Sequence, residues 1–161
     1  MPARALTKDP AMYSPANSVL PDPIRHAEFY DGVPVKRGLA WVVDMILIAL
    51  ITALIVPFTA FTALFFLPVL YLVVGFVYRW VSLSRKSATP GMRLLSLTFL
   101  DRQGMAFDPA TAFAHTLGYS LSVAFVIPQV ISVGMMLISS RAQGLTDIVL
   151  GSVAINRPMG G

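Results

Sequence analysis

The sequence predicts an all-α membrane protein with a bundle of about four membrane helices, two full spans plus a helical hairpin, and a small two-stranded cytoplasmic β element. Of its 161 residues, 56% are hydrophobic and only 12% are charged, whereas soluble domains carry about 25% charged residues. Between Gly38 and Tyr78, Asp44 is the only charged residue. That run is long enough for two spans of about 20 residues each.

We expect three regions along the chain: a flexible cytoplasmic tail (residues 1–35), a membrane domain (36–156) and a short tail (157–161). The first region contains six prolines among polar residues and shows no apolar periodicity, a pattern typical of disordered segments. It also lacks the apolar core of a signal peptide. The first span is therefore expected to direct insertion.

The first span is predicted from about Val35 to Val56, where Pro57 ends or kinks the helix. The second is predicted from about Ala60 to Leu83, with a kink at Pro68. Lys and Arg residues cluster before the first span and after the second, and the connection between the spans carries none. The positive-inside rule therefore places both termini in the cytoplasm, and we expect an inner (cell) membrane protein embedded in a lipid bilayer.

The polar region 84–108 is predicted to contain a turn and a strand. SATPG at 87–91 is a turn signal, because Pro and Gly interrupt regular structure. Leu95, Leu97 and Phe99 then alternate with polar residues, as in a half-buried strand. A second β-like segment, GSVAIN at 151–156, can pair with this strand at the cytoplasmic surface.

The last apolar segment, 109–140, is too long for one upright span and too short for two full ones. We favour a hairpin of two helices, from about Pro109 to Val126 and from about Pro128 to Ser140, over one tilted helix. A hairpin returns the chain to the cytoplasm and lets the two strands meet. Ala114, Gly118 and Ser122 form a small-residue stripe that allows close helix packing.

Asp44 is the residue that most needs an explanation, because an aspartate in a span costs about 2.5–3.5 kcal/mol on insertion scales. Arg37 lies on nearly the same helix face, about 10 Å away along the axis. Two roles for Asp44 remain open: an ion or proton site, and a hydrogen-bond acceptor that locks the first helix to the C-terminal motif. We predict that Arg37, Arg93 or Arg141 lies close to Asp147.

Three ordered motifs resemble the RDD family of small integral membrane proteins: Arg37 with Asp44, ATPGMRLLSL at 88–97, and RAQGLTDIVLGSVAI at 141–155. The resemblance covers about residues 30–156. It implies that Arg37, Asp44 and Asp147 are the family's Arg and two Asp, joined by Arg93 in a charged cluster.

The resemblance also implies a turn motif at Thr89, Pro90 and Gly91, and a protein suspected in transport, since some relatives are linked to cation/proton exchange. Three positions depart from the family pattern, and one of them is Thr146, since the family usually has His or Gly before the residue that matches Asp147. Met92 replaces a Lys in the turn, and His115 replaces an Arg in the third helical segment, where it removes a permanent positive charge.

We therefore predict a small transporter or ion/proton exchanger, with Asp44 and His115 as candidate ion or proton sites. The alternative is a non-transporting membrane scaffold, as a homo-oligomer or as part of a larger membrane complex. We expect no enzyme, cofactor or metal, because the sequence pairs no nucleophile with a base and has no metal-spaced cluster or phosphate loop. We also expect no nucleic acid, because the net charge of +4 comes from basic residues that flank the spans.

Overall fold

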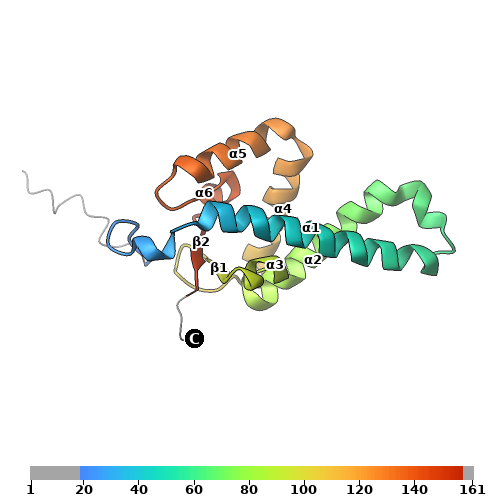
Figure 1. The fold of residues 1–161 in the computed structure, drawn as a ribbon, viewed down its shortest axis with the longest axis horizontal. Helices are drawn as coiled ribbons and strands as arrows, with labels where there is room; N and C mark the ends of the chain where they lie inside the picture. Colours follow the sequence, from blue (N-terminus) through green and yellow to red (C-terminus); the bar gives the residue numbers. More distant parts are fainter. Residues whose placement is uncertain (1–18, 158–161) are drawn as a thin grey trace, which may run out of the picture.

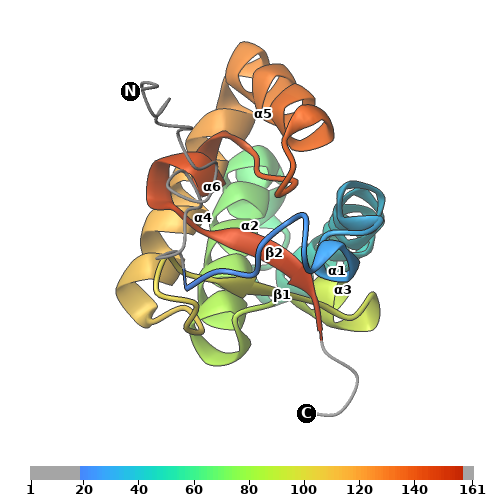
Figure 2. The ribbon, with the colours of Figure 1, turned by 90° about the vertical axis from the view of Figure 1, so that its left-hand side faces the viewer.

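The computed structural model describes residues 19–157 as a helical bundle with a two-stranded sheet at one end (Figures 1 and 2). In chain order the elements are η2 (Ala27–Phe29), α1 (Val33–Phe58), η3 (Thr62–Phe66), α2 (Leu67–Lys86), α3 (Pro90–Leu94), β1 (Leu97–Leu100), α4 (Pro109–Ala124), α5 (Val126–Ile138), α6 (Leu145–Leu150) and β2 (Val153–Asn156).

Two helical segments are long and apolar enough to cross a membrane, as predicted. They are Ala27–Phe58 and Thr62–Lys86, with mean hydropathies of 2.7 and 1.9. Figure 1 shows α1 and α2 as a long hairpin that extends away from the sheet. Their exposed side chains include many large apolar residues, which suits contact with lipid. The orientation of these helices in the bilayer stays a prediction.

The prolines mark helix ends more than kinks. Pro57 lies one residue before the end of α1. Of the two outcomes expected for this proline, a helix end and a kink, the structure shows the helix end. The kink predicted at Pro68 is wrong, because Pro68 is the second residue of α2. In the first turn of a helix the backbone N–H has no intrahelical partner, so the proline ring is tolerated there. A short 3-10 turn, η3, precedes it in place of the first turns expected for the second span.

The last apolar segment is broken, as predicted, into α4 and α5, which are bent by 116° relative to each other. The break lies at Phe125, three residues before Pro128, because Pro128 occupies the first turn of α5. The 13 residues of α5 reach about 20 Å, which is less than the roughly 30 Å of a bilayer core. α5 is therefore too short to span the core as an upright helix.

The predicted pairing of the two strands is confirmed. β1 and β2 are antiparallel, with Leu97 opposite Asn156 and Leu100 opposite Val153. This pairing brings together the two ends of the segment that holds α4, α5 and α6 (Figure 2). Leu97 is fully buried in a core cluster that also contains Val33 of α1.

The flexible tail predicted for residues 1–35 is wrong in its last part. Leu20 and Tyr30 are buried against Val153 and Ile155 of β2, and the Tyr30 hydroxyl donates a hydrogen bond to the Pro21 carbonyl at 2.9 Å. These apolar side chains cover one face of the sheet, which explains the order of this segment. Residues 1–18, and 158–161 of the expected C-terminal tail, lie outside the described part of the chain.

The turn predicted at 87–91 is a bend at residues 87–88 that leads into the start of α3 at Pro90. Thr89 is its N-cap and accepts a hydrogen bond from the Met92 N–H at 3.2 Å, as N-cap threonines do. Gly91 packs directly on α1: a Cβ at this position would collide with the Ala40 carbonyl and lie 2.8 Å from Oδ1 of Asp44. The Thr-Pro-Gly sequence thus supplies a cap, a helix start and a close helix contact.

This contact predicts that Gly91→Ala lowers the free energy of unfolding by about 1–3 kcal/mol, because the added methyl group has no room. Gly38→Ala is the matched control, since nothing lies within 4 Å of a Cβ there. In the middle of α1 that change should raise stability by about 0.5–1 kcal/mol. Unfolding of both variants in detergent measures the difference, and equal stabilities would contradict the packing assigned to Gly91.

Candidate functional site

Two buried carboxylates line one cavity between the helices. Asp44 belongs to α1 and Asp147 to α6, and each side chain is only 1% exposed. A buried carboxylate is costly unless hydrogen bonds or charges satisfy its oxygens. The partners of these two acids therefore define the candidate site.

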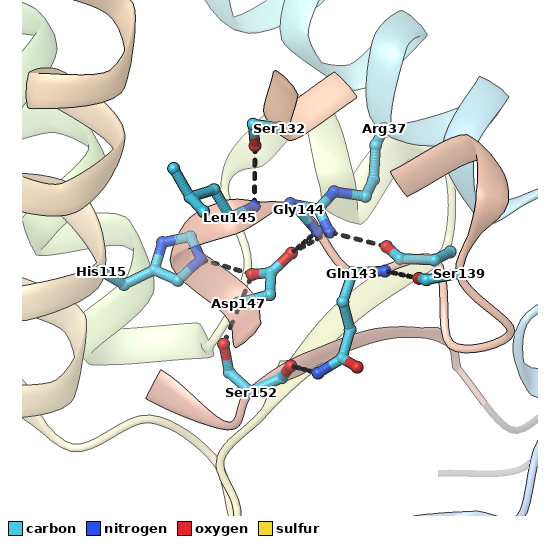
Figure 3. Close-up of polar contacts among 10 residues, drawn as sticks. Arg37, His115, Ser132, Ser139, Gln143, Gly144, Leu145, Asp147 and Ser152 are labelled. Carbon is cyan, nitrogen blue, oxygen red and sulfur yellow. Dashed lines mark hydrogen bonds and ion pairs between the residues drawn. The ribbon is translucent and has the colours of Figure 1, made fainter. Parts of the chain in front are cut away.

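Asp147 joins three helices through one carboxylate (Figure 3). Its Oδ2 lies 2.5 Å from Nη1 of Arg37 on α1 and accepts the Gly144 N–H at 2.9 Å. Its Oδ1 lies 2.9 Å from Nε2 of His115 on α4, and the Ser152 hydroxyl donates to the same oxygen at 3.4 Å. Arg37 also donates to the Ala142 carbonyl at 3.3 Å, so the ion pair ties α1 to the C-terminal motif.

Burial by itself would raise the pKa of Asp147. The Arg37 charge and the hydrogen bond and charge of His115 outweigh burial, and together they hold the pKa of this carboxyl well below its usual range. Asp147 is therefore ionised at neutral pH, and it balances the charge of Arg37.

Asp44 has a different set of partners, which contains no cation within residues 19–157. Its Oδ1 accepts the Tyr78 hydroxyl at 2.7 Å and the Gly91 N–H at 2.9 Å, and its Oδ2 accepts the Thr89 hydroxyl at 2.6 Å. These donors come from α2, from α3 and from the N-cap of α3. The carboxylate thus connects α1 to both following helices, and it satisfies an N–H at the start of α3 that has no intrahelical partner.

His115 is the third titratable group of the site. Its ring lies against Phe99 and Phe107, with centroid distances of 4.5 and 5.4 Å. The imidazole uses Nε2 for Asp147, while Nδ1 is buried and has no hydrogen-bond partner within residues 19–157. An ionised Asp147 calls for a donor at Nε2, which leaves Nδ1 as the nitrogen that can accept a proton.

A cavity of about 430 Å³ lies between the helices, and both acids line it together with His115. A volume of this size is typical of small-molecule sites. Arg37 and Arg79 contribute positive charges to its wall. Most of the remaining wall surface is apolar, and polar side chains are interspersed in it: Thr89, Thr116, Tyr119, Ser122, Gln129, Ser132 and Thr146.

The structure brings together most of the residues predicted for the site. Of the three arginines predicted to lie close to Asp147, Arg37 is the one that forms an ion pair with it. Thr89 and Gly91 of the turn motif both donate to Asp44. The placement of Arg93 in the charged cluster is wrong, because Arg93 is exposed on α3. α3 turns Gly91 toward α1, and this rotation carries the Arg93 side chain to the outside.

Sequence reasoning missed two residues of α2, Tyr78 and Arg79, as members of the site. Tyr78 binds Asp44, and Arg79 stacks on the Tyr119 ring at 4.1 Å. One signal could have found Arg79: it is a charged residue within the predicted span, and such residues usually face the bundle interior. Among the described residues, no group of three or more His, Cys, Asp or Glu could hold a metal ion.

In a comparison with protein-family models, the model of the RDD family matches residues 32–151. That range includes Arg37, Asp44 and Asp147. No curated protein and no solved structure matches the chain.

The partners of Asp44 predict that Tyr78→Phe lowers the free energy of unfolding by about 1.5–3 kcal/mol, the usual value of a hydrogen bond to a charged group. Tyr71→Phe on the same helix is the matched control. The Tyr71 hydroxyl lies 3.4 Å from the Met45 carbonyl and 3.1 Å from its sulfur, so its loss should cost less than about 1 kcal/mol. Equal losses in detergent unfolding would contradict a special role for Tyr78.

The lowered pKa of Asp147 predicts acid sensitivity. Because the folded-state pKa lies below the ordinary value, the ionised carboxylate stabilises the fold above about pH 4, and this contribution is lost as pH falls through the lowered pKa. Asp147→Asn should lower Tm at neutral pH by at least about 5 °C and should flatten the acid limb of a plot of Tm against pH. Asp31→Asn, at an exposed carboxyl, should leave that limb as steep as in the wild type. If Asp147→Asn leaves the limb unchanged, the ion pair is not its source.

Proposed function

Because the chain belongs to the RDD family, we propose that it is a small integral membrane transporter or ion/proton exchanger whose proton site is the pair His115 and Asp147. The observation that carries this proposal is the position of the pair, which is buried between helices but borders the cavity. A titratable pair inside a membrane bundle is a functional site by default. The proposal is for a transporter rather than an enzyme.

The proton in this proposal binds to His115. Arg37 keeps Asp147 ionised, so Asp147 is a poor proton carrier at neutral pH. An imidazole nitrogen can take up a proton, and Nδ1 of His115 has no competing hydrogen-bond partner in the described part of the chain. Proton uptake there would add one positive charge beside the cavity. Such a change in cavity charge is a means of coupling a proton to a transported ion.

The geometry favours the locking role for Asp44 over the role of an ion site. Three donors occupy its two oxygens, and a bound cation would have to replace them. Asp44 nevertheless lines the same cavity, so a cation that entered would meet it. The flux measurement below includes Asp44 for this reason.

A scaffold without transport is the second candidate function. The observation that favours it is the apolar outer surface of α5, where Val126, Ile127, Leu137 and Ile138 are all highly exposed. Such a surface suits a neighbouring membrane subunit as well as lipid. On this alternative, the protein would assemble as a homo-oligomer or within a larger membrane complex. We further propose an inner (cell) membrane location with both termini in the cytoplasm, on the basis of the Lys and Arg distribution.

The transport proposal predicts proton flux across vesicles that contain the purified protein and a trapped pH-sensitive dye. Imposed sodium, potassium or phosphate gradients should drive the flux. His115→Gln should reduce it to the level of empty vesicles, because Gln keeps a donor for Asp147 but does not titrate. If Asp44 only holds the helices together, an Asp44→Asn variant that folds should retain the flux.

Arg93→Gln is the matched control, since Arg93 is exposed and removed from the cavity. It should leave the flux unchanged. Equal flux from wild type and His115→Gln would overturn the assignment of the proton site. If purified, folded wild-type protein carries no proton under any of the gradients, the scaffold becomes the better account.

A further inference from the structure

Arg79 brings a positive charge to the cavity wall, and none of the described residues 19–157 forms an ion pair with it. In the described part of the chain its guanidinium has no ion pair and no hydrogen bond, and its Nη2 atom is buried and unsatisfied. Its one contact of note is the Tyr119 ring, 4.1 Å from Cζ. A buried charged donor without an acceptor is costly. An acceptor from outside the described chain would offset this cost.

Other donors of the cavity wall are also free. The Tyr119 hydroxyl accepts from Trp41 Nε1 at 2.7 Å, so its own proton is available. Gln129 accepts from the Ser122 hydroxyl through Oε1 at 2.9 Å, which leaves its amide nitrogen. Ser132 accepts the Leu145 N–H at 2.9 Å. For these three donors, no acceptor is recorded within residues 19–157.

The acidic groups of the wall are, by contrast, already occupied. Asp147 is shared by Arg37 and His115, and both oxygens of Asp44 accept hydrogen bonds from the protein. The hydrogen-bonding groups of these side chains that remain unused are therefore mainly donors. Three donors satisfy the charge of Asp44, whereas the Arg79 guanidinium has no hydrogen-bond acceptor within residues 19–157. Such a wall favours a ligand rich in acceptor oxygens.

We infer that the cavity binds a phosphate-type oxyanion, with the Arg79 guanidinium as its main ligand and Tyr119, Gln129 and Ser132 as further donors. The inference rests on the proposed function, in that it names the class of ion that the cavity takes. Arg is suited to this role because its planar fork donates two hydrogen bonds to one phosphate group. A tetrahedral anion can also accept from donors that come from three helices, α2, α4 and α5.

Two sources can supply this chemistry, a soluble phosphate and the phosphate of a lipid headgroup. Arg79 lies seven residues before the end of α2, which is about 10 Å along the helix axis. This depth is within reach of the headgroup region. The experiment therefore uses one probe for each source.

The test measures Tm of the full-length protein in neutral detergent at fixed pH and fixed ionic strength. Sodium phosphate, with sodium chloride as its reference, probes the soluble anion. Dioctanoyl phosphatidic acid, with dioctanoylglycerol as its reference, probes the headgroup. At least one phosphate probe should raise the Tm of the wild type in a saturable manner, as ligands of the folded state do. The probe that does so identifies the source.

Arg79→Gln should abolish this rise or increase the half-saturating concentration by at least about tenfold, the usual loss for a charge-assisted hydrogen bond. Arg85→Gln is the matched control, because it removes an exposed positive charge from the same helix and should leave the rise intact. Where Arg79→Gln does not fold, Arg79→Lys keeps the charge without the fork and should still weaken the response several-fold.

Three results would overturn the inference: no probe raises the wild-type Tm above its reference, Arg79→Gln responds as the wild type does, or Arg85→Gln loses the response equally. Failure of the proposed function is distinguishable, because this measurement needs no transport. His115→Gln should lose proton flux but retain the phosphate response, since the Arg79 guanidinium remains. A phosphate response without flux in the wild type would leave the anion site standing and remove the transporter.

Discussion

The burial of two carboxylates inside an apolar bundle is the constraint on which the rest of this structure depends. Neither Asp44 nor Asp147 can remain in such a place unless several donors reach its oxygens. The chain meets this need with donors that are far apart in sequence. Arg37 reaches Asp147 across 110 residues, and Thr89 reaches Asp44 across 45. Each acid thus holds together segments that are far apart in sequence. These contacts matter because helices in lipid lack a hydrophobic driving force toward one another.

The hydrogen bonds and the ion pair of the two acids explain the small elements at the sheet end of the bundle. α3 is only five residues long, yet it presents the Gly91 N–H and the Thr89 hydroxyl to Asp44. Only a glycine at position 91 lets the backbone come so close to α1. The pairing of β1 with β2 closes the chain behind Asp147. The sheet and α3 are therefore the supports that bring donors to the acids, and the same arrangement leaves the cavity between them.

The features that sequence predicted well were those with a local signal. Apolar runs located the two spans, alternation located β1, and Arg37 was one of the three arginines predicted to lie close to Asp147. The donors of Asp44 were missed, because Tyr78 and Gly91 meet Asp44 only after three helices have packed. Arg93 was misplaced, since its direction depends on the rotation of α3, which Gly91 sets. Pro68 was read as a kink because the sequence does not show that its helix begins one residue earlier.

The separation of Asp44 from Arg79 is the feature that joins stability to the proposed site. Both side chains line one cavity, and a direct ion pair between them would satisfy both. In the described structure Asp44 instead takes its donors from Tyr78, Thr89 and Gly91, and Arg79 is left to stack on Tyr119. A bundle built only for stability gains nothing from an unsatisfied guanidinium. The arrangement suits a protein in which Asp44 holds the helices together and Arg79 binds an anion that enters and leaves the cavity.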